Sequence, residues 1–422
     1  MREYNHLFLS LYDIEYWSLN KNMHSHNPKH RLIFWVSTVL ALLAFVSLNI
    51  YLPSLPAIQK NLLASALGLK LSITLFLIGF ALSQFFWGSF SAKYGRKKLV
   101  ILGLIIADLG SMTAMLAPNI FIFDTARLFE GLGIGAAGVL CRAMLTDTFD
   151  SHELSKALSY VGSLGNVMPA LAPIMGGYII LAGSWRLIFL ILIIYTSALI
   201  FVFFFSVHET NQKIQKDFGL KSAMKEYGHI LSNRTFMTYF CPVMMLSGGM
   251  VGYYAATPFI FISYLHISAQ HYSFLSITTV TTYVLGAQSS NFLNKKLGLK
   301  KTVFCGLLLS FVAFILALIL NFTTNLNALS VILPMAIYTL GAGLVAPIAS
   351  GHALSTVRHV AGAAAAVFGG LVYGMSAIST LLFTSMDLSK LSSLATYLGI
   401  LSLLALGLFC WLARERSKKI RA

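Results

Sequence analysis

Charged residues are scarce in this chain. Only 10% of its 422 residues are Asp, Glu, Lys or Arg, whereas soluble domains average about 25%. Acidic residues are the rarer kind, with 14 Asp and Glu against 30 Lys and Arg. The chain is 57% hydrophobic and contains 31 Phe. Disordered, collagen-like and nucleic-acid-binding proteins are therefore excluded, because their surfaces are mostly polar, and the lipid bilayer is the expected solvent.

Cysteine is also rare, and no two of the four cysteines have the spacing of a metal or redox motif. All four lie in apolar stretches and are interpreted as small buried hydrophobes: Cys141, Cys241, Cys305 and Cys410. Four histidines that could bind a metal are scattered over three predicted helices, mostly near their ends. No Walker-type glycine loop is present, which argues against direct use of ATP. We therefore expect no metal, no cofactor and no enzymatic activity.

Long apolar runs make up most of the sequence. A helix needs about 20 mainly apolar residues to cross a hydrocarbon core about 30 Å thick. Unbroken runs such as residues 187–205 favour helices over a membrane barrel, whose strands would alternate in polarity. Twelve spans are predicted, at residues 32–52, 71–91, 99–117, 122–145, 155–181, 186–207, 236–264, 271–293, 302–320, 328–349, 359–385 and 391–413.

A central polar stretch divides these spans into two sets of six. Lys93, Gly95, Lys97 and Lys98 after span two recur after span eight at a constant offset of 203 residues, which suggests duplication. The sequence predicts an all-α integral membrane fold of twelve transmembrane helices in two pseudo-symmetric six-helix bundles. Its expected parts are a cytoplasmic N-terminal extension (1–31), a first bundle (32–207), a central cytoplasmic linker (208–235), a second bundle (236–413) and a basic cytoplasmic tail (414–422).

Basic residues fall mainly on one side of the predicted membrane. Alternate segments, counted from the N-terminus, hold 25 of the 30 Lys and Arg, and the other set holds Lys60, Lys70, Arg186 and Lys390. Cytoplasmic loops retain positive charge, so both termini are predicted to be cytoplasmic. Residues 1–30 lack the apolar core of a signal peptide, and Met23 could be the true start. The histidines that follow Met23 could bind a metal weakly, although an idle tail explains them better.

A tight basic turn follows the second predicted span. It contains Gly88, Lys93, Gly95, Arg96 and Lys97. Glycine lets the backbone bend between two helices, and the cations meet the anionic leaflet. In this position of a twelve-span chain the turn resembles the signature of the major facilitator superfamily. The alternative is a generic basic loop.

Five further segments resemble the drug:proton antiporters of the bicyclomycin-resistance (Bcr/CflA) type within that superfamily. They are residues 51–56, 126–133, 142–147, 169–177 and 257–259. The resemblance covers about residues 32–413 and implies proton-coupled export of small hydrophobic or amphipathic compounds, such as drugs, by alternating access. It further implies a monomer in the inner (cytoplasmic) membrane whose energy source is the proton gradient. Export of one native metabolite or siderophore, and proton-independent transport, remain alternatives.

Small residues line one face of the fifth predicted span. The motif Pro169, Pro173, Gly176 and Gly177 belongs to this face, which lets a neighbouring backbone approach closely. In the antiporters that the chain resembles, the face is thought to pack across the two halves and to seal the cytoplasm-facing leak. Plain helix packing explains the same residues equally well.

Two charged residues lie deep in the fourth predicted span. A charge at a helix centre costs about 2.5 to 3.5 kcal/mol on insertion scales, so Arg127 and Glu130 must face the protein interior or water. Three residues apart, they share a face and can pair. We interpret Glu130 as a proton carrier beside a hydrated passage, with Arg127 setting the local potential; the alternative is a static ion pair. Asp108, in mid-span three, is a second protonation site or a hydrogen-bonded acid.

Two positions depart from the pattern of the resembled antiporters. Asn49 stands where an acid usually precedes the Tyr-Leu-Pro run, and it cannot titrate. Ala92 replaces the usual acid of the loop signature, which removes a partner for the charges there. Because Glu130 replaces the usual Gln of the span-four motif, we expect the proton-carrying carboxyl to have moved to that position.

A mostly apolar substrate cavity is expected between the two bundles, drawing on spans one, two, four, five, seven, eight, ten and eleven. Amides and aromatic residues of these spans supply its few polar groups. Taken singly, each is better explained by packing or interface anchoring. The candidates are Asn49, Tyr51, Gln84, Tyr160, Asn166, Tyr253, Tyr254, Tyr283 and Tyr338.

Overall fold

The structure, a computed structural model, describes residues 28–211 and 220–419. Every regular element in these ranges is helical. The first 27 residues of the predicted N-terminal extension, with Met23 and its neighbouring histidines, lie outside the described residues. The helices are α2 (Pro28–Asn49), η1 (Leu52–Ser54), α3 (Leu55–Asn61), α4 (Ala66–Tyr94), α5 (Arg96–Leu116), α6 (Ile120–Thr148), α7 (Ser151–Leu181), α8 (Arg186–Phe205), α9 (Leu220–Ser232), α10 (Arg234–Pro258), η2 (Phe259–Tyr264), α11 (Ala269–Leu297), α12 (Leu299–Thr323), α13 (Ala328–Ser355), η3 (Arg358–Val360), α14 (Ala361–Ser385) and α15 (Leu391–Lys419).

Each of the twelve predicted spans coincides with a long helix. Within the described residues, eleven helices are long and apolar enough to cross a membrane. The exception by composition is α11, whose 29 residues include a polar stretch of Ser and Thr. Its length still exceeds the roughly 20 residues that a span requires. Its serines and threonines face the protein in part, since Ser273, Ser276 and Thr279 are buried.

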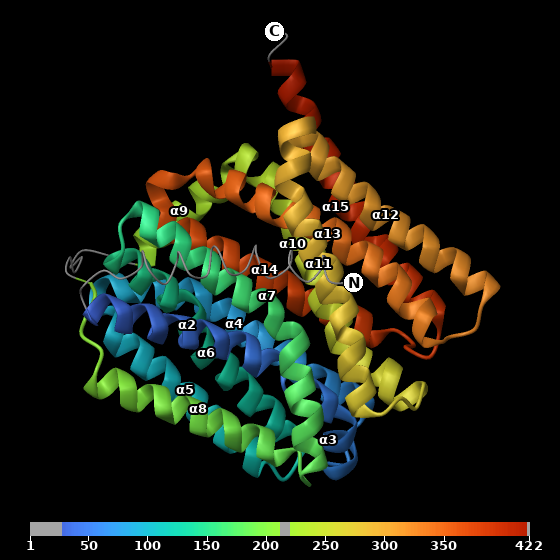
Figure 1. The fold of residues 1–422 in the computed structure, drawn as a ribbon, viewed down its shortest axis with the longest axis horizontal. Helices are drawn as coiled ribbons and strands as arrows, with labels where there is room; N and C mark the ends of the chain where they lie inside the picture. Colours follow the sequence, from blue (N-terminus) through green and yellow to red (C-terminus); the bar gives the residue numbers. More distant parts are fainter. Residues whose placement is uncertain (1–27, 212–219, 420–422) are drawn as a thin grey trace, which may run out of the picture.

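The helices form two groups. In the first half, α2, α5 and α4 pack on α6, and α8 packs on α5; in the second, α10, α11 and α12 pack on α13, and α15 packs on α12. Figure 1 shows the blue-to-green first half beside the yellow-to-red second half, with α9 between them in the chain. The halves meet along two helix pairs, α4 with α14 and α7 with α11.

The molecule has two chemically different ends. We call one end the basic end; it carries the start of α2, residues 205–211, helix α9 and the turns at 94–96, 148–151, 297–299 and 355–361. The other end is called the opposite end. At the opposite end the halves are in direct contact. The Ser273 hydroxyl donates to the carbonyl of Pro173 at 2.9 Å, and Lys70 Nζ donates to the carbonyl of Thr384 at 2.5 Å. The structure is therefore closed at the opposite end.

Two glycines make the sharp turns at the basic end. Gly95, between α4 and α5, has φ +91° and ψ 156°, and Gly298, between α11 and α12, has φ +79° and ψ 160°. Both conformations favour glycine, because a side chain is strained at positive φ. The two positions are 203 residues apart. The sequence match between the halves therefore extends to backbone conformation.

The four cysteines differ in their surroundings. Cys141 and Cys241 are buried as expected, whereas Cys305 is half-buried and Cys410 is exposed. The expectation that all four are buried is therefore wrong for the last two. They lie on α12 and α15, whose outward faces are apolar because lipid covers them, so an apolar sequence context did not imply burial in protein.

Candidate functional site

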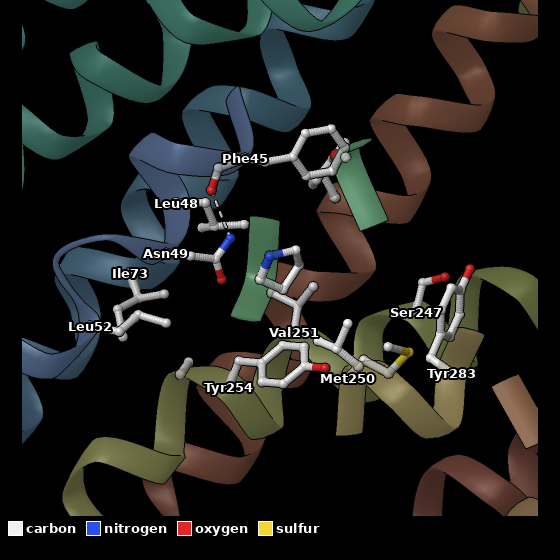
Figure 2. A pocket seen from close by; sticks show the side chains of 15 residues that line it. Phe45, Leu48, Asn49, Leu52, Ile73, Ser247, Met250, Val251, Tyr254 and Tyr283 are labelled. Atoms are coloured by element: carbon white, nitrogen blue, oxygen red, sulfur yellow. Dashed lines mark hydrogen bonds between the residues drawn. The ribbon is translucent and has the colours of Figure 1, made fainter. Parts of the chain in front are cut away.

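A central cavity of about 160 Å³ lies between the two halves. Helices α2, α4 and α7 line it from the first half, and α10, α11 and α14 line it from the second. Three of the predicted cavity residues, Asn49, Tyr254 and Tyr283, are on its wall (Figure 2). The described lining includes no residue of α6 or α13, so the expected contributions of spans four and ten are wrong for this cavity.

Asn49 supplies a polar group of this wall. Its Nδ2 donates to the carbonyl of Phe45 one turn earlier at 2.8 Å. Figure 2 shows the amide oxygen pointing away from that bond. Tyr254 donates its hydroxyl to Thr279 Oγ1 at 3.2 Å, so this tyrosine presents mainly its ring to the cavity.

Sequence reasoning identified Tyr254 but missed the other residues of the helix face on which it lies. Ser247, Met250, Val251 and Tyr254 follow one another on α10 at intervals of three, one and three residues, which is the spacing of a single helix face. The signal was present in the sequence, but polarity alone selected the tyrosines. Tyr373, from α14, was missed in the same way.

Four predicted cavity residues are packed elsewhere, which corrects their assignment. Tyr51 and Tyr338 are fully buried, and Tyr338 donates to the carbonyl of Leu246 at 3.4 Å. Tyr253 is buried against Tyr254, with ring centroids 5.8 Å apart. Tyr160 packs edge-on against Trp35 at the contact of α7 with α2. The side chain of Asn166 lies outside the described part of the structure.

A second cavity, which we call the vestibule, has a volume of about 480 Å³ and lies at the basic end. Gln84, predicted for the central cavity, lines the vestibule instead. On α4, Ile73 lines the central cavity and Gln84, three turns later, lines the vestibule. Between these positions, the ring of Phe80 meets that of Tyr373 with centroids 4.3 Å apart. An aromatic contact thus separates the two cavities along this helix.

Helix α9 of the central linker forms part of the vestibule wall. Tyr227 donates its hydroxyl to the Phe85 carbonyl at 3.1 Å and lies 2.9 Å from Ser89 Oγ. Burial raises the pKa of Tyr227, so its hydroxyl stays a neutral donor. The linker is therefore fastened to α4 of the first half while it leads into the second.

The charged side chains of the vestibule come from several helices. Arg96 Nε pairs with Asp147 Oδ2 at 3.0 Å, and both line the cavity with Arg142 from α6 and Glu226 from α9. This ion pair gives Arg96 a partner despite the alanine at position 92. The vestibule therefore presents both signs of charge, unlike the central cavity.

Residues of the basic turn hold the first half together. Glu209 Oε1 accepts the backbone N–H of Arg96 at 2.8 Å, and its Oε2 accepts that of Lys97 at 3.2 Å, which satisfies the N-terminus of α5. Lys97 Nζ donates to the Phe204 carbonyl at 3.0 Å. A Cβ on Gly95 would lie 2.4 Å from Glu209 Oε2, so a larger residue would displace this carboxylate as well as strain the backbone at φ +91°. Gly88 lines the vestibule, and Lys93 lies over the ring of Tyr94.

Arg127 and Glu130 form an ion pair, as their spacing predicted. Arg127 Nη1 lies 2.5 Å from Glu130 Oε2, and both side chains are 0% exposed. The guanidinium lies over the rings of Tyr51 at 4.1 Å and Phe76 at 4.3 Å. Arg127 Nε and Glu130 Oε1 have no hydrogen-bond partner among the described atoms. The pair is thus buried but incompletely satisfied.

The expectation that this pair borders a hydrated passage is wrong for this structure, which is closed at the opposite end; we call this conformation the closed state. Neither residue lines the central cavity or the vestibule. The rings of Tyr51, just after α2, Phe76 of α4 and Phe189 of α8 cover the guanidinium. The Ser47 carbonyl accepts from its Nη2 at 3.5 Å. Any proton exchange at Glu130 requires these helices to separate first.

Asp108 lies apart from both cavities. The hydroxyls of Thr196 and Ser197 on α8 both donate to its carboxylate, the latter at 3.1 Å. The contact joins α5 to α8, the outer pair of the first half. The geometry matches the hydrogen-bonded acid rather than the second protonation site.

The small-residue face of α7 packs closely at the opposite end. A Cβ on Gly176 would lie 1.8 Å from the carbonyl oxygen of Ile50 in the first half, and one on Gly177 would lie 3.0 Å from Ser273 Oγ in the second. Pro169 lines the central cavity, and the carbonyl of Pro173 accepts from Ser273. The face does pack across the halves, but the seal that it forms is at the end opposite the basic loops.

Three curated relatives resemble this chain over different lengths. Residues 37–380 match the family model of the Major Facilitator Superfamily. The "Uncharacterized MFS-type transporter YdgK" of Bacillus subtilis (strain 168) is 34% identical over 258 residues, which cover 59% of this chain and 64% of that protein. "Multidrug resistance protein D" of Escherichia coli (strain K12) is 26% identical over 86% of this chain and 91% of its own length. "Bicyclomycin resistance protein homolog" of Haemophilus influenzae is 24% identical over 87% and 93%.

A solved structure has the same fold. The crystal structure of a D-xylose-proton symporter superposes with a TM-score of 0.70 at 15% sequence identity, over 90% of this chain and 97% of that chain. At this identity the likeness concerns the fold alone.

Proposed function

Because the chain belongs to the major facilitator superfamily, we propose that it exports small hydrophobic or amphipathic compounds in exchange for protons. Its family, its twelve-helix fold and its being a transporter rather than an enzyme agree with the sequence predictions. Relatives named for multidrug and bicyclomycin resistance support drug efflux as the direction and class of transport. The observation that carries the proposal is a mostly apolar cavity between two halves that touch at the opposite end.

The proposed cycle alternates access to that cavity. The opposite end is closed by contacts between α7 and α11 and between α4 and α14. The vestibule, at about 480 Å³, lies on the basic side of the central cavity. If the basic end is cytoplasmic, as the charge count predicts, this state receives substrate from the cytoplasm. Rocking of the halves would then open the opposite end and release it outside.

Proton coupling is proposed to involve Glu130. It is a carboxylate buried completely within a span, and one of its oxygens lacks a hydrogen-bond partner among the described atoms. When the carboxyl is protonated, its attraction to Arg127 is lost, so the helices around the pair can separate at lower free energy. Because the pair is covered in the closed state, the proton would bind only from the outward-open state. A proton on Glu130 would thus be tied to the change of conformation.

The cellular setting follows the relatives. The chain is a multi-pass membrane protein, and we place it in the inner membrane of a bacterial cell with both termini in the cytoplasm. We propose a monomer that acts on a small-molecule substrate and protons within the lipid bilayer, with no cofactor beyond the proton gradient.

The deciding experiment compares net flux with exchange in proteoliposomes. A pH-sensitive dye inside reports proton movement while candidate compounds are screened, and labelled substrate reports exchange without a gradient. We expect Glu130→Gln to keep substrate exchange but to lose proton-driven accumulation. Asp108→Asn is the matched control, since that acid lies away from both cavities, and it should keep both activities. Equal proton-driven accumulation by wild type and Glu130→Gln would refute Glu130 as the proton carrier. If the screen finds that only one metabolite is exported, export of that metabolite replaces drug efflux as the function.

A further inference from the structure

The wall of the central cavity contains no charged side chain among its described residues. Its polar groups are the Asn49 amide, the Ser247 hydroxyl and tyrosine hydroxyls, and the rest are aliphatic or aromatic. The other lining side chains include Leu48, Ile73 and Val251. A charged molecule that entered would lose water without gaining a counter-charge.

The charged side chains on either side of this cavity do not line it. Lys70, one turn before Ile73 on α4, donates to the Thr384 carbonyl at the opposite end. Arg127 and Glu130 neutralise each other at 2.5 Å and are covered by the rings of Tyr51 and Phe76. The charged groups of the vestibule, Arg96, Arg142, Asp147 and Glu226, lie on the far side of the Phe80 and Tyr373 contact.

Aromatic rings could in principle hold a cation through their faces. In Figure 2 the rings of Phe45, Tyr254 and Tyr283 lie on different sides of the pocket rather than around one point. Tyr373 is already in contact with the ring of Phe80. The interaction free energy of a permanent cation with one ring face is smaller than the hydration free energy that the cation loses on burial without a counter-ion.

We infer that the central cavity accepts uncharged amphipathic molecules and excludes permanent cations and anions. The preferred molecule has an apolar or aromatic body and a hydrogen-bonding group within reach of Asn49. This inference narrows the substrate class of the proposed export and rests on that function. Asn49 is the position from which the charge selectivity can be changed, because its amide lies on the wall and its free oxygen is isosteric with a carboxylate oxygen.

The test measures the charge preference of the cavity without the need for a known substrate. Cys305 and Cys410 are replaced by Ser, the two buried cysteines are kept, and Val251→Cys places a thiol on the cavity wall. Three methanethiosulfonates are compared: the neutral 3,3-dimethylbutyl reagent, its trimethylammonioethyl isostere and the anionic sulfonatoethyl reagent. Each transfers its alkylthio group to the thiolate, forming a disulfide and releasing methanesulfinate. Asn325→Cys, in an exposed turn of the same background, supplies the reference rates, and the background without an added thiol is the blank.

For each charged reagent we take the ratio of its reaction rate to that of the neutral reagent. We expect this ratio to be lower at position 251 than at position 325 by about tenfold or more. Asn49→Asp should raise the relative rate of the cationic reagent at position 251 about tenfold and lower that of the anionic one. Asn49→Ala should change neither ratio. Equal charge preference at the two positions, or no reaction of any reagent at position 251, would overturn the inference.

The outcome separates the inference from the function on which it rests. Modification does not require transport, so unselective modification combined with proton-driven flux would refute the cavity preference alone. Selective modification without any compound-dependent proton flux would refute proton-coupled export alone. Circular dichroism and gel filtration of the Val251→Cys protein verify that it is folded, and Met250→Cys on the same helix face provides a second reporting position.

Discussion

The burial of Arg127 and Glu130 makes a quantitative prediction about stability. Both side chains are 0% exposed, and no described water-accessible cavity reaches them. Removal of one member of such a pair leaves an uncompensated buried charge, which costs about 3 to 5 kcal/mol. Glu130→Gln keeps the shape of the side chain but leaves the Arg127 guanidinium without a counter-charge. We therefore expect the free energy of unfolding to fall by about 3 to 5 kcal/mol.

A double variant that removes both charges extends this prediction. Arg127→Met combined with Glu130→Leu fills a similar volume with apolar atoms, so no buried charge remains. Replacement of buried ion pairs by packed hydrophobes is often neutral or stabilising by about 1 to 4 kcal/mol. The double variant is therefore expected to be more stable than Glu130→Gln alone, although two side chains have been changed.

A surface pair of the same spacing provides the control. Lys390 and Asp387 are also three residues apart, with Nζ and Oδ2 at 3.1 Å, but their side chains are 69% and 48% exposed. Exposed pairs contribute little because water and salt screen them. Lys390→Gln should therefore leave the unfolding midpoint almost unchanged. The free energies can be measured by denaturant titration in mixed micelles, with near-ultraviolet circular dichroism as the signal.

The reasoning would be refuted by a small effect of Glu130→Gln. A loss below about 0.5 kcal/mol, as for ordinary surface changes, would mean that Glu130 is already neutral or that water reaches the pair. A double variant less stable than Glu130→Gln would mean that the charges contribute more than their burial costs.

Three further predictions concern the contacts between the halves and the driving force. Lys70→Met removes an ammonium group buried at the opposite-end contact, where it donates to the Thr384 carbonyl and lies 5.6 Å from the centroid of the Phe259 ring. Its desolvation then no longer opposes closure, so spin labels at 117–119 and 324–327 should report a shift toward the closed state on the order of 1 kcal/mol. Tyr227→Phe removes the hydroxyl that ties α9 to α4 and should weaken that attachment by about 1 kcal/mol. Amide hydrogen exchange in α9 should then be faster. Tyr264→Phe, at an exposed site, is the control and should leave this exchange unchanged. Exchange of an uncharged substrate for protons moves net charge across the membrane. A potassium diffusion potential, negative inside, should therefore raise the driving force for export by about 2.3 kcal/mol per 100 mV for each charge moved, and export should be faster at the same pH difference. An export rate that does not depend on the potential would contradict either the uncharged substrate or the exchange for protons.

The sequence was sufficient for the helices because their signal is local. Runs such as residues 187–205 must be helical in lipid, where every backbone group needs an internal partner. The spacing of Arg127 and Glu130 likewise predicted their pairing, since residues three apart share a helix face. The turn at Gly95 was recognisable for the same reason.

The positions of side chains relative to the cavity depended on several helices at once. Tyr253 and Tyr254 are neighbours in the sequence, yet Tyr254 lines the cavity and Tyr253 does not. The covering of Arg127 needs the ring of Tyr51 together with rings from α4 and α8, which no single segment reveals. Lys70 was counted as a loop charge, whereas it donates across the two halves to Thr384. Such contacts arise from the packing of distant segments, and their residue types alone do not identify them.

The covered ion pair and the uncharged cavity have a joint consequence for coupling. A carboxyl on the cavity wall could exchange protons with whichever side the cavity faced, and protons could then cross without substrate. Glu130 is instead enclosed in the first half while the opposite end is closed. If the outward-open state exposes it, each proton that enters must be followed by closure of that end around the pair. Substrate and proton would then occupy separate places and compete through the conformation of the two halves, and not for the same side chains.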